Sequence, residues 1–123
     1  MIFGIGVDLC SINRMEKSIE SEHFLRRVFT EDEIRYAVGK ARPARHFAGS
    51  FAAREAFSKA SGISMYSVAF GGAWVERTSS GPVLRLSDTV RELLPEAGEK
   101  RIHLSLTHDG EYAIAMVVME VNG

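Results

Sequence analysis

This chain of 123 residues contains one cysteine and no long hydrophobic run. A single cysteine, Cys10, excludes an internal disulfide framework and any metal site built from a cysteine cluster. The amino terminus lacks the basic start and apolar stretch of a signal peptide, and no apolar run approaches the roughly 20 residues that a membrane helix needs. We therefore expect a cytoplasmic protein with no membrane partner.

The common catalytic and nucleotide-binding motifs are also absent. There is no Gly-x-Ser-x-Gly, His-Glu-x-x-His or Walker-type segment, and the Gly-x-Gly at 4–6 is not followed by the third glycine of a dinucleotide fingerprint. Cys10 has no positioned base near it in the sequence, and we interpret it as a small packing residue. No nucleophile of this chain is therefore marked for covalent catalysis.

The net charge is only −1, but the charge is unevenly distributed. Residues 1–34 carry 4 basic and 7 acidic residues, residues 35–59 carry 6 and 1, and residues 60–123 carry 5 and 8. The central block either binds an anionic partner or is an ordinary solvated helix face. The chain lacks the overall basic excess of a protein that tracks phosphates, so we expect no nucleic-acid partner.

Hydrophobic periodicity predicts one α+β domain over 1–123, with a mainly antiparallel sheet packed against one long and several short helices. Residues 2–8 alternate as a strand with two glycines and Asp8 on one face, which indicates that another element approaches closely there. The long helix is expected at 43–61, ending at Gly62. The other expected elements are short helices after Ser11, near Phe24 and after Thr30, strands at 69–77 and 82–87, a helix capped by Asp88, and strands at 101–107 and 112–121.

Three side chains are candidates for a metal and phosphate site. Asp8 ends its strand and is either a metal ligand or a turn or capping aspartate. Glu55 lies in an apolar stripe of the long helix, so its charge needs a partner, which is either Lys59 one turn later or a cation. If Asp8 and Glu55 converge, their oxygens suit Mg²⁺, or Mn²⁺, with Lys59 beside them as a phosphate-binding amine. His108, at a predicted hairpin, is either a titratable site residue or a surface histidine.

Three segments carry a resemblance to a known family. They read Gly-Ile-Gly-Val-Asp-Leu at 4–9, Phe-Ala-Ala-Arg-Glu-Ala-Phe-Ser-Lys-Ala at 51–60 and Ser-Leu-Thr-His at 105–108. Together they resemble the holo-acyl-carrier-protein synthases, the small group of 4′-phosphopantetheinyl transferases. The order, the spacing and the chain length all fit, so the resemblance spans essentially the whole chain.

The resemblance implies transfer of 4′-phosphopantetheine from coenzyme A to a serine of apo-acyl-carrier protein, a step of fatty acid biosynthesis that releases adenosine 3′,5′-bisphosphate. It also implies Mg²⁺ and a homotrimer with active sites between subunits. By position, Asp8 and Glu55 match the metal ligands, Lys59 matches the pyrophosphate-binding lysine and His108 matches the site histidine. Glu55, Lys59 and His108 are then the expected catalytic residues, with Glu55 or a metal-bound water as the base.

The sequence departs from the family pattern at three places. The family commonly has lysine at the position of Arg54 and often a basic residue at the position of Ser50, and its Gly-Lys-Pro turn is replaced here by Ser-Gly-Pro at 80–82. Arg45 or His46 is expected to supply the charge missing at position 50. The expected coenzyme A contacts are Lys59, Arg54, Arg45, Gly81, Pro82 and His108.

The carrier protein is acidic, so its binding surface should be basic and apolar. By resemblance this surface lies on the first helices, with Arg14, Met15, Phe24 and Arg27 as candidate contacts. Two other functions remain open on the sequence. The chain could be a non-catalytic module that binds coenzyme A or a nucleotide, or a metal-dependent phosphohydrolase that uses the same carboxylates.

Overall fold

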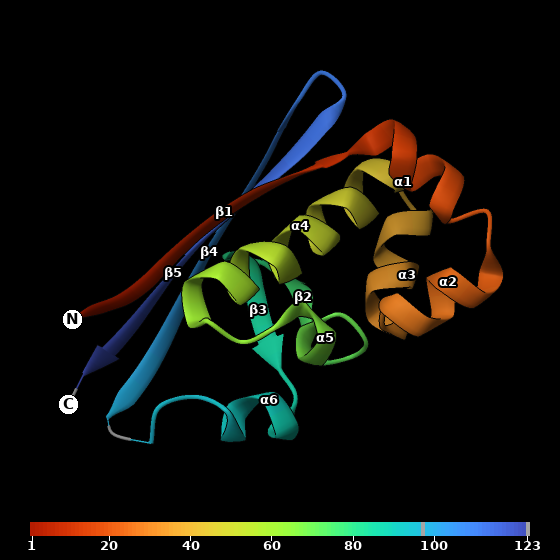
Figure 1. The fold of residues 1–123 in the computed structure, drawn as a ribbon. Helices are drawn as coiled ribbons and strands as arrows, with labels where there is room; N and C mark the ends of the chain where they lie inside the picture. The colour runs from red at the N-terminus through yellow and green to blue at the C-terminus, as the bar shows by residue number, and fades with distance from the viewer. Residues whose placement is uncertain (97, 123) are drawn as a thin grey trace.

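A three-stranded antiparallel sheet with strand order β1-β5-β4 carries the long helix α4 across one face (Figure 1). The computed structural model describes residues 1–96 and 98–122. In chain order the elements are β1 (Ile2–Ser11), α1 (Ile12–Ser18), α2 (Glu22–Val28), α3 (Glu31–Val38), α4 (Pro43–Ser61), α5 (Met65–Val68), β2 (Ala73–Thr78), β3 (Gly81–Leu86), α6 (Asp88–Glu92), β4 (Glu99–Asp109) and β5 (Tyr112–Asn122).

Local signals at the helix ends explain where most of these elements begin and stop. The helix α4 begins at Pro43 and ends at Gly62, whose φ of 79° is the left-handed conformation that glycine adopts without strain. Thr30 forms the expected capping box at the start of α3, because its hydroxyl accepts from the Glu33 amide and the Glu33 carboxylate accepts from the Thr30 amide. The predicted antiparallel α+β domain is confirmed.

Three local predictions were wrong. The strand expected at 69–77 begins only at Ala73, as β2, because the chain leaving α5 first turns tightly at Gly72, where a Cβ would lie 2.3 Å from the Ser67 carbonyl oxygen. Ser87, not Asp88, caps α6. The strands β1 and β4 are longer than predicted, so both Asp8 and His108 lie inside strands.

The strand β1 and the helix α4 lie very close together. A Cβ at Gly4 would lie 1.8 Å from the carbonyl oxygen of Ala60, and one at Gly6 would lie 1.9 Å from that of Ala56. Only glycine leaves room for the helix backbone at this distance. The prediction that another element approaches the glycine face is therefore confirmed, and the element is the helix that carries Glu55 and Lys59.

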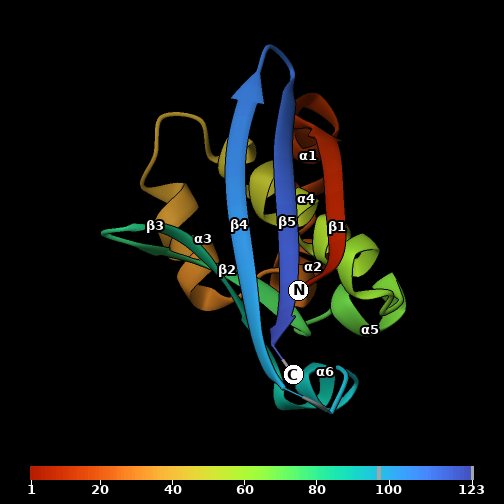
Figure 2. The same ribbon diagram turned by 90° about the vertical axis from the view of Figure 1, so that its left-hand side faces the viewer.

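The two faces of the three-stranded sheet differ in burial. The face toward α4 is the core, where Ala115, Val117 and Met119 of β5 are fully buried. On the other face, which Figure 2 shows toward the viewer, Ile5, Val7 and Leu9 each leave more than half of their surface exposed. Val7 pairs with Met116 of β5, which is also exposed, so apolar side chains continue across the strands. Among the described residues, no helix combines the length and apolar character that crossing a bilayer requires.

Gly6→Ala should destabilise the protein by about 1–3 kcal/mol, because the new methyl group meets helix backbone that cannot rotate away. Urea denaturation measures the effect. Gly39→Ala is the matched control, since its φ is −80° and a Cβ there would meet nothing closer than 3.7 Å. The control should be neutral or slightly stabilising. Equal effects of the two substitutions would contradict the close contact between β1 and α4.

Candidate active site

A first cavity, of about 320 Å³, lies between β1, α1 and α4. The strand β1 contributes Asp8 from its glycine face, and α4 contributes Glu55 from the turn next to Ala56. The tight contact between these two elements therefore brings the two carboxylates to one cavity. The complete lining is Asp8, Leu9, Cys10, Ser11, Arg14, Met15, Ser18, Phe24, Phe51 and Glu55.

Lys59 pairs with Asp8 and not with Glu55. Its Nζ lies 2.8 Å from Asp8 Oδ1 and donates to the carbonyl oxygen of Val7 at 3.0 Å. Within residues 1–96 and 98–122, Glu55 belongs to no ion pair. The sequence allowed two partners for Glu55, which were Lys59 and a cation. Because Lys59 pairs with Asp8, the alternative left for Glu55 is the cation.

The electrostatics of this cavity favour an added positive charge. Burial raises the pKa of Glu55, and the neighbouring Asp8 carboxylate raises it further, against the opposing effect of Lys59. Burial, with Asp8 and Glu55 nearby, also raises the pKa of the Cys10 thiol to about 11. Cys10 is therefore a neutral thiol at neutral pH, in agreement with its interpretation as a packing residue.

The donor set fits a hard divalent cation that keeps most of its water. Two carboxylates share the cavity, and the part of the chain that the structure describes has no group of three histidine, cysteine or acidic side chains placed for a metal. Mg²⁺ is commonly bound by one or two carboxylates together with waters and substrate phosphates. Asp8 and Glu55 meet that requirement, whereas a zinc site would need more protein ligands.

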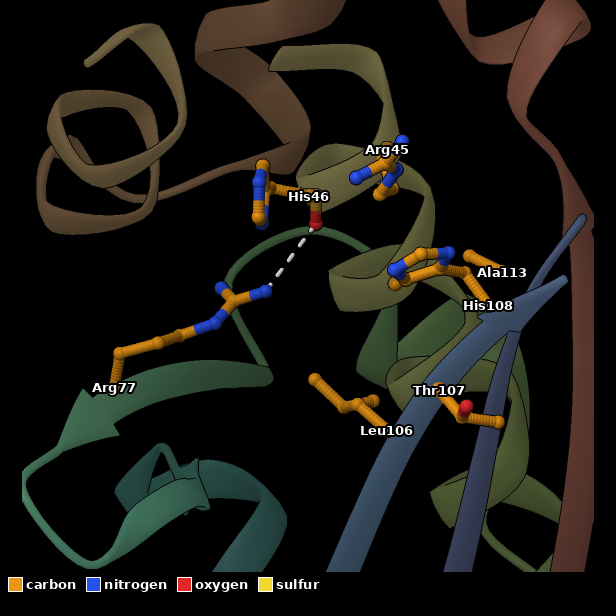
Figure 3. Close-up of a pocket in the computed structure, with 8 residues that line it drawn as sticks. Arg45, His46, Arg77, Leu106, Thr107, His108 and Ala113 are labelled. Carbon is orange, nitrogen blue, oxygen red and sulfur yellow. Dashed lines mark hydrogen bonds between the residues drawn. The ribbon is translucent and has the colours of Figure 1, made fainter. Parts of the chain in front are cut away.

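A second region of cavities lies at the other edge of the sheet, where the start of α4 meets β2 and β4. Arg45, His46, Arg77 and His108 surround a cavity of about 90 Å³ (Figure 3). A neighbouring cavity of about 420 Å³ shares His46 and Arg77 and is also lined by Gly81 and Pro82. Arg45, His108, Gly81 and Pro82, which the sequence predicted as coenzyme A contacts, thus lie together.

The two regions are separate within one chain. They share no lining residue. Asp8 lies on β1 and His108 on β4, and β5 runs between these two edge strands. The sequence prediction had assigned Lys59 and His108 to one site. In one protomer Lys59 contacts Asp8 of the first cavity, whereas His108 lines a cavity of the second region.

Arg54 does not reach either cavity, so its prediction as a coenzyme A contact was wrong. Its side chain is fully buried and forms a bidentate ion pair with Glu33, with Nη2 to Oε1 at 2.6 Å and Nη1 to Oε2 at 2.9 Å. It also donates to the carbonyl oxygens of Ser50 and Val28. The carboxylate of Glu33 accepts from the amide of Val75 as well, so the pair joins α2, α3, α4 and β2.

The predicted carrier contacts differ in how far they are exposed. Arg14 and Phe24 line the first cavity, and Arg14 is exposed beside it. Arg27 is also exposed, with its guanidinium 4.3 Å from the centre of the Phe70 ring. Met15 also lines that cavity, but it is only 4% exposed and packs in the core, so it presents little surface to a carrier. A single sequence shows that a methionine is on a helix but not that the next helix covers it.

Arg77 is the cavity residue that the sequence analysis missed. Its guanidinium donates to the Ser50 hydroxyl at 2.9 Å. Position 50 is where the basic residue expected from the family resemblance is missing. Ser50 on α4 and Arg77 on β2 are 27 residues apart, so no local pattern connects them. The one signal in the sequence was that Arg77 lies in a predicted strand next to the turn that contains Gly81 and Pro82, two predicted coenzyme A contacts.

Arg54→Met should destabilise the fold by about 3–5 kcal/mol, because it leaves the carboxylate of Glu33 buried without its cation. Denaturation in urea measures the loss. Arg35→Met is the control, since the ion pair of Arg35 with Asp32 is exposed on both sides and should contribute less than about 1 kcal/mol. A stable Arg54→Met protein that has lost only nucleotide binding would contradict the structural role.

Glu55→Gln should stabilise the metal-free protein at pH 7. A raised pKa means that the folded state holds the Glu55 proton more tightly than the unfolded chain, so ionised Glu55 opposes folding at neutral pH. The gain should stay below about 1 kcal/mol, because the group is partly solvated, and should vanish below about pH 4, where both states are protonated. Denaturation without divalent cations at pH 7 and at pH 3.5 tests this, and a loss of stability at pH 7 contradicts it.

Comparison with known proteins shows similarity to one family along nearly the whole chain. Residues 4–117 match the 4′-phosphopantetheinyl transferase superfamily. A holo-[acyl-carrier-protein] synthase of Geotalea daltonii is 41% identical over 98% of this chain and 99% of its own, and one of Caulobacter vibrioides is 42% identical over 98% and 96%. The structure of a holo-(acyl-carrier-protein) synthase from Bacillus anthracis in complex with CoA superposes with a TM-score of 0.78 at 38% identity, covering 99% of both chains. The chain belongs to the 4′-phosphopantetheinyl transferase superfamily.

Proposed function

We propose that this protein transfers the 4′-phosphopantetheine group of coenzyme A to a serine of apo-acyl-carrier protein, giving holo-acyl-carrier protein and adenosine 3′,5′-bisphosphate. The observation that carries the proposal is the pair of carboxylates, Asp8 and Glu55, in one cavity with Lys59 at its edge. The relatives that match over the whole chain are holo-[acyl-carrier-protein] synthases, and one solved relative holds CoA.

The nucleophile comes from the partner. The serine oxygen of the carrier attacks the phosphorus that bears the pantetheine arm, and the bond from this phosphorus to the oxygen of the nucleotide 5′-phosphate breaks. The serine proton must be accepted during the attack, and Glu55 is a carboxylate of the cavity that can accept it. This chain therefore needs no activated serine or cysteine of its own.

Negative charge grows on the pyrophosphate oxygens during this step, so the enzyme acts mainly through positioning and electrostatics. The amine of Lys59, half-exposed at the edge of the first cavity, is placed to bind these oxygens. Asp8 and Glu55 would hold Mg²⁺, or Mn²⁺, which when bound supplies Lewis-acid neutralisation of the phosphate oxygens. His108 serves from the second cavity by positioning a phosphate or a water.

Both cavities are needed for one reaction, and this requires a second copy of the chain. The nucleotide contacts of one protomer and the carboxylates of another can meet if the exposed apolar sheet face packs against a neighbour. That face carries Ile5, Val7 and Leu9 of β1 and Met116 of β5. A contiguous exposed apolar surface of this kind is typical of an interface. We propose a homotrimer with the active sites between protomers.

The carrier would bind beside the first cavity, where Arg14 and Arg27 are exposed on α1 and α2. These basic side chains suit an acidic partner and should act mainly on association rate and salt dependence. A cytoplasmic location stays a prediction of the sequence.

The direct test is the mass of a carrier protein. Incubation of apo-acyl-carrier protein with this enzyme, coenzyme A and Mg²⁺ should add about 340 Da, the mass of the transferred group. Asp8→Ala and Glu55→Ala should each abolish the gain, while Glu16→Ala, an exposed acidic residue of α1, should retain it. No gain with several carriers at high enzyme concentration would contradict the transfer. Binding of coenzyme A without turnover would indicate a binding module, and release of pantetheine phosphate without carrier would indicate a phosphohydrolase.

Met116→Lys should dissociate the assembly, because it places a charge in the middle of the proposed interface. Light scattering coupled to size exclusion should change from three protomer masses to one, and transfer activity should fall at least tenfold. Tyr66→Lys is the control, since Tyr66 is 87% exposed on the helix α5 and is not part of the sheet. A fully active Met116→Lys monomer would contradict the intersubunit site.

A further inference from the structure

A further cavity, of about 450 Å³, lies between β3, α6 and β4. The strand β3 belongs to the two-stranded sheet and β4 to the three-stranded sheet, so this cavity is at the junction of the two sheets. Figures 1 and 2 both show α6 at this end of the molecule, next to the start of β4. The cavity shares no lining residue with the first cavity or with the second region of cavities.

The floor of this junction cavity is apolar. Leu84 and Leu86 of β3 are each 6% exposed, and Leu94, which follows α6, is 7% exposed. All three belong to the main core cluster, and Ile102 of β4 packs against it. Because these side chains are recessed, a chain that enters the cavity reaches them, whereas a flat surface such as a bilayer does not.

The remaining polar lining is entirely cationic. It consists of Arg85 on β3, Arg91 on α6 and Lys100 on β4, and no acidic side chain lines the cavity among the described residues. Arg85 is paired through Nε with Glu76 at 2.6 Å. Within residues 1–96 and 98–122, the side chains of Arg91 and Lys100 form neither an ion pair nor a hydrogen bond. Two cations from different elements are therefore available to one ligand.

The combination of an apolar floor and cationic lining selects the chemistry of the ligand. Arginine presents a planar fork that matches the two oxygens of a carboxylate. Ligand cavities of about 300–1,000 Å³ are mostly apolar, with a few charged groups that fix the orientation of the ligand. An inorganic anion would leave the leucine floor uncovered, and a neutral hydrocarbon would make no use of the cations. An anionic head on an aliphatic chain satisfies both parts of the cavity.

We propose that the junction cavity binds a carboxylate with an aliphatic chain, the chemistry that a fatty acid presents. The carboxylate contacts Arg91 and Lys100, and the chain covers Leu84, Leu86 and Leu94. The inference does not rest on the proposed function, because none of these residues lines the cavities assigned to group transfer.

The test is a titration of the isotope-labelled protein with octanoate, followed by the NMR shifts of its backbone amides. Saturable shifts should appear in β3, α6 and the start of β4. Arg91→Gln and Lys100→Gln should each raise the Kd about three- to tenfold, because each removes a charged hydrogen bond to the carboxylate. Arg101→Gln is the matched control, since Arg101 is the exposed neighbour of Lys100, is paired with Glu99 and does not line the cavity. Its Kd should equal that of the wild type.

Two further probes separate the head from the chain. Acetate carries the charge without the chain, and 1-octanol carries the chain without the charge, so neither should give saturable shifts at concentrations where octanoate does. Octanol that binds as tightly as octanoate would overturn the inference, because the cations would then have no role. An unchanged Kd in both Arg91→Gln and Lys100→Gln would also overturn it. Binding to vesicles of anionic phospholipid without any octanoate shifts would indicate a membrane-contacting surface and contradict the cavity site.

Discussion

The backbone contact between β1 and α4 is the constraint on which the first cavity depends. Because Gly4 and Gly6 let the helix lie directly on the strand, Asp8 two residues further along comes to the turn of α4 that carries Glu55 and Lys59. A larger side chain at either glycine would push the strand away from the helix. The carboxylates would then separate, and the proposed cation could not be shared between them. The Gly-x-Gly-x-Asp spacing therefore has both a packing purpose and a chemical one.

Two neighbouring residues of α4 show how helix geometry divides structural and chemical roles. Arg54 turns into the protein and joins four elements through its ion pair with Glu33, while Glu55 turns toward the cavity on the other side. Breaking the buried pair would release α3 and β2 from α4, and β2 carries Arg77. The buried ion pair thus holds β2, which lines the second region of cavities, against α4. The glycine contact in the same way holds β1 against α4 at the first cavity.

Much of this could be read from the sequence, and the reason for each success or failure is physical. The helix from Pro43 to Gly62, the capping box at Thr30 and the glycine face of β1 are local patterns, so the sequence was sufficient for them. The roles of Arg54 and Met15 depend on which element covers them, and the contact of Arg77 with Ser50 depends on how β2 folds back onto α4. Tertiary contacts of this kind leave no periodic signal in one chain.

The proposed homotrimer would explain both the small size of the chain and its exposed sheet face. A protomer of 123 residues places its carboxylates at one sheet edge and its cationic cavities at the other, with β5 between them. In the proposed homotrimer, neither half completes the site alone. The exposed apolar face would then be the surface that brings the halves of different protomers together.

Complementation between two inactive variants tests this account most directly. One variant carries Glu55→Ala and the other carries Arg45→Ala with His108→Ala, and the two are refolded together in equal amounts. If each active site takes its carboxylates from one protomer and its cations from another, the mixture should recover about a quarter of the wild-type rate of carrier modification, the fraction of intact interfaces under random assortment. A mixture no more active than the separate variants would show that each site lies within one chain and would contradict the account.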